Sequence, residues 1–331
     1  MKISKFKEML RQIQEERGIK QESIIAALEE AMLSAAKKRF PNNENITVKI
    51  SDAGETKVFD NDKEVTPSDF GRLAAQTAKQ VIVQRIREAE KDGLFEEYIT
   101  KVGQLITGVV QKRESGGYLV NIGRLEAYLG NMEMIPGESY RTKDHVKMIV
   151  LEVKKSPKGP LVVLSRSNPD FIKKLFEMEV PEIEQGVLEI KGIAREAGRR
   201  TKIAIKSNDP NIGVIGTCVG QMGSRIQNVT REIGGERIDI IEWSDKPIKY
   251  IASALSPSKG GKIEINEEER AVKVILGNKD LSLAIGKDGQ NVRLAAKLTG
   301  YKIDIVSEEE SEGKNQNKEG ENGKEETPKK D

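Results

Sequence analysis

Apolar residues recur at helical spacing through most of the first hundred positions. Two such faces occupy residues 1–40, and alternation over 46–50 and 57–59 predicts a short hairpin. A third apolar stripe follows Thr66-Pro67, a pair that suits the N-cap and the first position of a helix. The pattern therefore predicts an α/β head that ends in a long connecting helix of about 25 residues.

Residues 103–166 show no helical spacing and have the pattern of short strands. Glycine and proline residues separate runs of aliphatic, β-branched and aromatic side chains. Five strands in about 65 residues fit a five-stranded OB-type β-barrel. The predicted strands are Leu105–Gln111, Tyr118–Ile122, Leu125–Leu129, Val146–Val153 and Leu161–Leu164.

Two glycine tetrapeptides lie 66 residues apart in matching surroundings. In each copy another glycine follows 11 residues after the tetrapeptide, and a strand of the form basic-Ile-Asp-Ile comes next, at Arg237 and at Lys302. An internal repeat of this kind indicates a duplicated module. The tetrapeptides are Gly220-Gln221-Met222-Gly223 and Gly286-Lys287-Asp288-Gly289.

The surroundings of both tetrapeptides predict the same order of elements. A helix, two strands, a short helix, the glycine loop, a second helix and a last strand follow one another over 168–243 and again over 244–306. This is the order of the prokaryotic-type (type II) KH domain, a clamp for single-stranded nucleic acid. Residues 307–331 contain no aliphatic or aromatic side chain, which predicts a disordered charged tail.

Composition narrows the chemistry further. The 55 basic and 53 acidic residues nearly balance, but the tail carries a charge of −4, which leaves residues 1–306 mildly basic. A single cysteine, Cys218, and a single histidine, His145, argue against a thiolate-rich zinc site and against paired-histidine catalysis. We expect a small core residue at the first and a turn residue at the second. No catalytic residue, metal site or cofactor is therefore expected.

The start of the chain lacks the apolar segment of a signal peptide, and no run of about 18 apolar residues occurs. These features predict a cytoplasmic protein with no membrane segment.

The glycine loops are the leading candidates for a binding site. At a helix N-terminus, glycines let the backbone approach a phosphate, which the amides and the helix dipole attract. Lys287 adds a cation to the second loop, whereas the first loop has no charge of its own, so we expect the second to bind RNA more strongly. The predicted RNA-binding residues are Gly220, Gln221, Met222, Gly223, Ser224, Arg225, Gly286, Lys287, Asp288, Gly289, Gln290, Asn291 and Arg293.

The predicted barrel adds further candidates. Lys112 and Arg113, at the first hairpin, could contact phosphates, and Tyr118 could stack on a base. Tyr128 is a second candidate for stacking. Because tyrosine is also a favoured strand residue, packing is the alternative for at least one of the two rings.

With these motifs in place, the sequence closely resembles the NusA family of bacterial transcription elongation, termination and antitermination factors. The resemblance covers nearly all of residues 1–306. The matching segments are Phe70–Val81, Ile86–Ala89, Ile135–Glu138, Val162–Arg166, Val180–Ile183, Ile193–Glu196, Thr201–Ala204, Cys218–Gly220, Arg237–Ile240, Leu283–Gly286 and Gly289–Ala295.

The resemblance implies a non-enzymatic, monomeric factor that binds core RNA polymerase and nascent single-stranded RNA, with other antitermination factors as further partners. It modulates pausing, termination and antitermination. The implied order is an RNA-polymerase-binding head with its connecting helix (1–101), an S-one-type OB barrel (102–167), two KH domains (168–243 and 244–306) and the tail (307–331).

Three features depart from the family pattern. The head between Phe40 and Thr66 is shorter than usual, and Met222 stands where the family usually has a basic residue. A short charged tail takes the place of the acidic repeats of some members. From the residues alone, two alternatives remain open. The chain could be an RNA-processing enzyme, or the RNA-holding component of one, or it could be a ribosome-associated RNA-binding factor.

Overall fold

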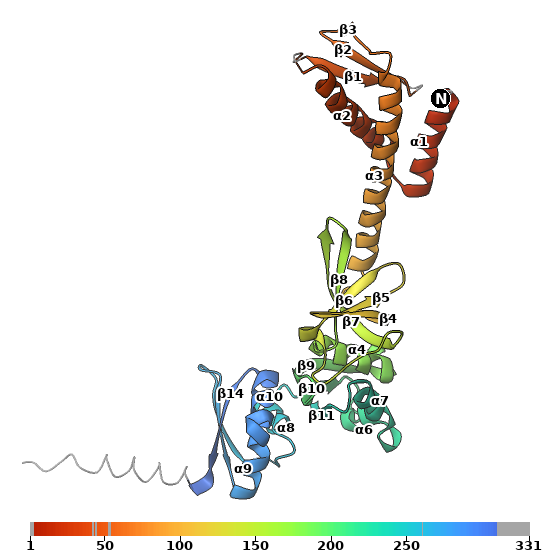
Figure 1. Ribbon diagram of the computed structural model, residues 1–331. Helices are drawn as coiled ribbons and strands as arrows, with labels where there is room; N and C mark the ends of the chain where they lie inside the picture. Colours follow the sequence, from red (N-terminus) through yellow and green to blue (C-terminus); the bar gives the residue numbers. More distant parts are fainter. Residues whose placement is uncertain (1–2, 42, 44, 52–53, 260, 310–331) are drawn as a thin grey trace, which may run out of the picture. The chain divides into compact units, whose positions relative to one another are not determined.

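The chain forms two compact units. The first consists of residues 1–101 with 153–161, and the second of residues 102–152 with 162–331. Figure 1 labels most of the elements of both. The computed structural model describes residues 3–41, 43, 45–51, 54–259 and 261–309. The predicted tail lies outside these residues from position 310 onward.

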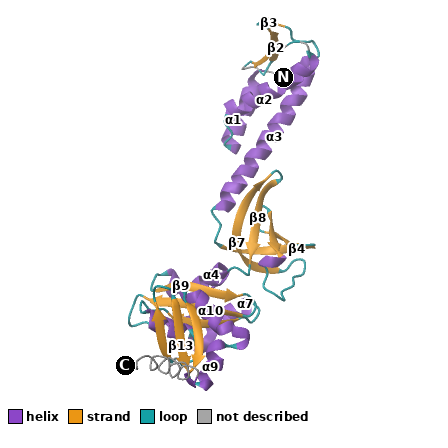
Figure 2. Ribbon diagram, turned by 90° about the vertical axis from the view of Figure 1, so that its left-hand side faces the viewer, coloured by secondary structure: helices purple, strands orange, loops and turns teal. Residues whose placement is uncertain are grey.

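The first unit is the head, in which helices pack on a small sheet. Its core joins the apolar faces of the first two helices to the sheet and to the start of the third helix, through Leu10, Leu28, Val58 and Phe70. Figures 1 and 2 show α2 beside the N-terminal part of α3. The elements are α1 (Ile3–Arg17), α2 (Gln21–Arg39), the antiparallel strands β1 (Ile46–Ile50), β2 (Thr56–Asp60) and β3 (Lys63–Glu64), and α3 (Phe70–Ile99).

Helix α3 begins later than the sequence predicts. The Thr66 hydroxyl accepts a hydrogen bond from the Val58 amide at 3.0 Å and so secures the end of the sheet. The helix starts at Phe70, after Asp69, whose side chain makes no capping hydrogen bond. The prediction of Thr66 as the N-cap is therefore wrong, because that hydroxyl already serves the sheet. The helix has 30 residues and is about 45 Å long.

The tip of a β-hairpin, residues 153–161, packs on the last turns of α3 within the same unit. Lys155 Nζ lies 3.1 Å from Asp92 Oδ1 and 4.9 Å from the centre of the Phe95 ring. Lys91 Nζ donates a hydrogen bond to the Pro157 carbonyl at 2.6 Å. These contacts hold the hairpin tip against the C-terminal half of the helix.

The predicted five-stranded barrel is confirmed. The strands close in the order β4-β5-β6-β8-β7, with β4/β5, β5/β6 and β4/β7 antiparallel and β6/β8 parallel, which is the arrangement expected of an OB-type barrel. His145 begins a strand, so its prediction as a turn residue is wrong. The strands are β4 (Leu105–Glu114), β5 (Gly117–Asn121), β6 (Glu126–Gly130), β7 (His145–Ser156) and β8 (Gly159–Ser165).

Both predicted KH domains are present, and each sheet pairs its central strand antiparallel to one neighbour and parallel to the other. The first comprises α4 (Pro169–Glu179), α5 (Pro181–Glu184), β9 (Leu188–Glu196), β10 (Arg200–Ser207), α6 (Val214–Val219), α7 (Ser224–Glu232) and β11 (Arg237–Glu242). The second comprises α8 (Pro247–Ala254), β12 (Lys262–Asn266), β13 (Ala271–Leu276), α9 (Asn278–Ile285), α10 (Gln290–Thr299) and β14 (Lys302–Ser307).

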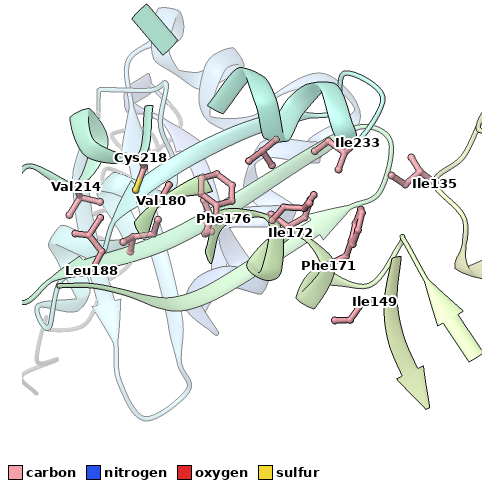
Figure 3. Close-up of a cluster of buried hydrophobic side chains, with 14 residues drawn as sticks. Ile135, Ile149, Phe171, Ile172, Phe176, Val180, Leu188, Val214, Cys218 and Ile233 are labelled. Carbon is pink, nitrogen blue, oxygen red and sulfur yellow. The ribbon is translucent and has the colours of Figure 1, made fainter. Parts of the chain in front are cut away.

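The barrel and the first KH domain share one hydrophobic core. Phe171 and Phe176 of α4 pack between the sheet and α7, and both rings are fully buried. Ile135 and Ile149, which belong to the barrel segment of the chain, join the same cluster (Figure 3). Burial of this apolar surface fixes the barrel to the first KH domain.

A buried arginine reinforces that junction. Arg166 directly follows β8, and its side chain is only 4% exposed. Its Nη2 lies 2.7 Å from Glu138 Oε1, and its Nη1 lies 3.0 Å from Glu232 Oε1 at the end of α7. Nη2 also donates to the Glu232 carbonyl at 2.7 Å. One guanidinium therefore bridges the barrel and the first KH domain, with both ends of its planar fork in use.

The second KH domain stacks on the outer face of the first domain's sheet. Helix α10 packs on β9 and β10, where Gly192, Ala194 and Ala204 leave room for it. On this face Lys202 is completely buried, with its Nζ 3.0 Å from Asp239 Oδ2 and 2.9 Å from the Ser256 carbonyl of the second KH domain. Burial lowers the pKa of this lysine, and Asp239 opposes that shift.

The equivalent face of the second sheet is different. Lys273 pairs in register with Asp304, as Lys202 does with Asp239, so the two sheets can be compared residue by residue. The positions of Gly192, Ala194 and Ala204 are taken by Lys262, Glu264 and Ile275. Lys262 and Glu264 are exposed and form an ion pair of 2.8 Å. Large side chains therefore stand where the first domain has small ones.

Replacing Arg166 by methionine should lower the free energy of unfolding by about 3–5 kcal/mol, because Glu138 and Glu232 would be left without their buried counter-charge. Urea unfolding followed by circular dichroism measures the change. The control is Arg11→Met, which removes an exposed pair with Glu15 and should cost no more than about 0.5 kcal/mol. Equal losses in the two variants would contradict the assignment.

Candidate nucleic-acid interface

The two glycine loops have nearly the same backbone. Gly220 has φ 74° and ψ 175°, and Gly286 has φ 73° and ψ 173°. The third residues also agree, with φ 52° and ψ 24° at Met222 and φ 55° and ψ 28° at Asp288. A final glycine in left-handed conformation then begins α7 or α10, without a side-chain cap. Two helix N-termini with this geometry are sites that attract anions.

The first position of each loop requires glycine for two reasons: a side chain there would lie too close to the following helix, and its dihedral angles suit only glycine. A Cβ atom at Gly286 would lie 2.7 Å from Asn291 Cβ, and one at Gly220 would lie 2.8 Å from Arg225 Cγ. Both glycines also occupy a region of φ and ψ that is essentially restricted to glycine. The loop can therefore fold back over its own helix only with glycine at this position.

Asn291 and Arg225 occupy equivalent positions, and both secure the helix before the loop. The Asn291 side chain is fully buried, and its Nδ2 donates to the carbonyls of Ala284 at 3.0 Å and Leu255 at 2.9 Å. The prediction that Asn291 contacts RNA is therefore wrong. The sequence does not distinguish this amide from the exposed side chains of the same helix, and only the packing of α10 reveals that it points inward.

Arg225 is also engaged inside the first KH domain. Its Nη1 donates to the Thr217 carbonyl at 2.8 Å and lies 3.0 Å from Glu182 Oε2. The structure thus directs this cation toward α5 and α6. The first loop keeps Gln221, Met222 and Ser224 as exposed side chains, and Met222 is 94% exposed.

The second loop exposes both of its central side chains, Lys287 and Asp288. Gln290 and Arg293, on the helix that follows, turn instead toward Glu196 of the first KH domain. Arg293 Nε lies 2.7 Å from Glu196 Oε1, and Gln290 Nε2 lies 2.8 Å from Glu196 Oε2. The hydrogen bond from Arg293 holds the pKa of the Glu196 carboxyl below its usual range. Two predicted RNA contacts therefore also serve the junction between the KH domains.

Sequence reasoning missed Glu196 and Lys202, two residues of the first KH domain that form hydrogen bonds with the second KH domain. Glu196 and Arg293 are 97 positions apart, and no local pattern connects them. The only available signal was the internal repeat, which aligns Lys202 with Lys273 and so marks a charged position in the middle of a strand.

In the barrel, the structure separates the predicted residues. Lys112 and Arg113 are exposed on β4, and Lys112 Nζ lies 2.9 Å from Glu114 Oε1. Tyr118 is only 3% exposed and packs edge-on against Tyr140, with ring centres 5.4 Å apart. The prediction that Tyr118 stacks on a base is therefore wrong, because its strand directs this ring into the protein.

The part of the chain that the structure describes contains neither a candidate metal site nor a candidate membrane-spanning helix. Within it, no three histidine, cysteine, aspartate or glutamate residues are grouped so as to hold a metal ion. Cys218 is buried, which raises the pKa of its thiol to about 11. Among the described helices, none combines the length and apolar character needed to cross a membrane.

Family models match three parts of the chain. The NusA N-terminal domain matches residues 5–68 and 60–92. The NusA-like first KH domain matches residues 166–243, and the NusA-like second KH domain matches residues 247–313. The matches place the two KH modules where the glycine loops lie.

Three similar relatives each carry the name transcription termination/antitermination protein NusA. The protein of Halalkalibacterium halodurans is 43% identical, over 93% of this chain and 90% of its own length. That of Bacillus subtilis is 43% identical, over 89% of each chain. That of Thermus thermophilus is 38% identical, over 93% of this chain and 91% of its own.

The two glycines of the second loop should respond differently to alanine. Gly286→Ala should destabilise the fold by about 1–3 kcal/mol and weaken RNA binding, because the new Cβ would meet Asn291. Gly289→Ala, with nothing within 4 Å of the added atom, should cost only about 1–2 kcal/mol, from its left-handed backbone. Thermal unfolding and fluorescence anisotropy with labelled RNA measure both effects. A larger loss at Gly289 would contradict the close-approach argument.

Proposed function

The chain belongs to the NusA family, and from that premise we propose that it is a transcription termination/antitermination factor that holds nascent single-stranded RNA while bound to core RNA polymerase. The observation that carries the RNA part of the proposal is the pair of glycine loops with matching backbone. The names of the relatives support the transcriptional role.

Each loop supplies the elements that RNA binding requires. The sugar-phosphate backbone would lie against the glycines, with a phosphate at the start of α7 or α10, where uncapped amides and the helix dipole favour negative charge. Lys287 would add a point charge beside that phosphate in the second loop. The first loop would rely on its amides, because Arg225 is held by Glu182.

The two KH domains would act together on one strand. The contacts of Glu196 and Lys202 across their junction hold the second loop in a defined relation to the first. Once RNA occupies one loop, its effective concentration at the other is high, so total affinity exceeds that of either loop alone. A strand long enough to reach both loops is therefore the preferred ligand.

The head would contact the polymerase. It has a core of its own, and it matches the model of the NusA N-terminal domain over most of its length. The chain would thus keep its RNA-binding unit near the polymerase from which the RNA emerges. Pausing, hairpin formation and termination or antitermination would then depend on how firmly the KH domains hold the transcript.

A reciprocal exchange between the loops tests the RNA clamp. Lys287→Gln should weaken binding of single-stranded RNA and reduce the magnitude of the log–log salt slope by about 0.7, the loss of one phosphate contact. Gln221→Lys, at the equivalent place in the first loop, should have the opposite effect. Both positions are exposed, so stability should change by no more than about 0.5 kcal/mol. Anisotropy at several salt concentrations gives the slopes, and unchanged slopes in both variants would exclude these loops as the clamp.

Removal of residues 1–100 tests the role of the head. The intact chain should be retained by immobilised core RNA polymerase, and more strongly when single-stranded RNA emerges from it. The shortened chain should lose retention and still bind free RNA. As a control, Lys287→Gln should keep polymerase retention and lose RNA affinity. Equal retention of the intact and shortened chains would refute the proposed docking surface.

A further inference from the structure

The only tryptophan of the chain lies at the junction of the KH domains. Trp243 follows β11, and its amide donates to the Ile205 carbonyl at 2.8 Å. Alternation along β10 and β11 places this ring and Lys206 on the same face of the sheet as Lys202 and Asp239, the face that carries the second KH domain. Tyr250 of α8 lies beside it, with ring centres 6.3 Å apart.

Two lysine ammonium groups lie over the indole ring. The Nζ of Lys206 lies 5.0 Å from the ring centre, and the Nζ of Lys191 lies 5.3 Å from it, both within the range of cation–π interaction. Trp243 is half-buried and lies outside the hydrophobic clusters that form the cores of the two KH domains. Packing in those cores therefore does not account for a large aromatic ring between two cations.

Each of the two lysines forms an ion pair with a partly or largely exposed carboxylate. Lys191 lies 2.7 Å from Glu189, and Lys206 lies 3.9 Å from Asp245, which is 80% exposed. Ion pairs with exposed members contribute little to stability, so a phosphate can replace either carboxylate at small cost. An aromatic platform flanked by cations of this kind is the usual means of binding single-stranded nucleic acid without sequence preference.

We propose that Trp243, Lys191 and Lys206 form a third contact for single-stranded RNA, in which a base displaces a lysine ammonium from the indole ring and stacks there, and the lysines pair with the adjoining phosphate. The inference rests on the proposed RNA-binding function and extends it to a site outside both glycine loops.

The position of the site suits a continuous strand. Tyr250 donates a hydrogen bond to the Leu298 carbonyl at 3.2 Å, which ties this region to the C-terminal end of α10. The second glycine loop lies at the other end of that helix, and Gln290 and Leu298 are separated by about 12 Å along its axis. A strand that passes the second loop therefore has only a short distance to cover before it reaches Trp243.

The single tryptophan allows a direct test with the intact chain. Titration with a single-stranded oligoadenylate should quench the indole fluorescence, and the quenching should saturate at the same concentrations as the anisotropy of a labelled oligoadenylate. Trp243→Leu should weaken binding by about 5- to 140-fold, the loss of one stacked base. Thermal unfolding of that variant reports whether the fold is retained.

Variants that keep the tryptophan make the test independent of its packing. Lys191→Gln and Lys206→Gln should each reduce the magnitude of the salt slope by about 0.7, whereas the control Lys302→Gln, on the exposed face of the second sheet, should not. RNA binding seen by anisotropy, with unchanged fluorescence and unchanged slopes in both lysine variants, would overturn the third contact and leave the proposed function intact. No RNA binding by any readout would overturn both.

Discussion

The buried guanidinium of Arg166 is the interaction on which the arrangement of the second unit depends. Arg166 directly follows the last barrel strand, and its guanidinium pairs with Glu138 in the barrel segment and with Glu232 at the end of α7. Helix α7 begins at the first glycine loop, so the ion pair with Glu232 also holds the far end of the helix that follows this loop. Arg195 continues the network, because its Nη1 donates to the Arg166 carbonyl at 2.6 Å.

The contact between the two KH domains is formed in a comparable way, because the second domain supplies partners for charged groups of the first. The buried Lys202 donates a hydrogen bond to the Ser256 carbonyl. Glu196 accepts hydrogen bonds from Gln290 and Arg293, which follow the second loop. A buried lysine is tolerated only with such partners. The polar groups of the junction are therefore specific to one docking geometry, and the spacing of the two loops follows from it.

The sequence alone indicated the modules and their order because these depend on local periodicity: the head helices, the five strands, the duplicated glycine loops and the family were all predicted. What it did not indicate depends on tertiary contact. Tyr118 and Asn291 were predicted at the RNA surface and are buried. The periodicity of a strand or helix separates its faces but does not show which face packs against the core. Thr66 was predicted as a cap and serves the sheet instead, and Glu196 finds its partners 94 and 97 positions away.

The contact between the KH domains joins two different surfaces, the outer sheet face of one copy and the helices of the next. Heterologous interfaces of this kind generate open filaments when they do not close. The second sheet differs from the first on the equivalent face. Where the first presents Gly192, Ala194 and Ala204 to a helix, the second has the larger residues Lys262, Glu264 and Ile275. The two sheet faces therefore differ in side-chain size and charge, and only the face of the first sheet carries a KH domain within the described residues.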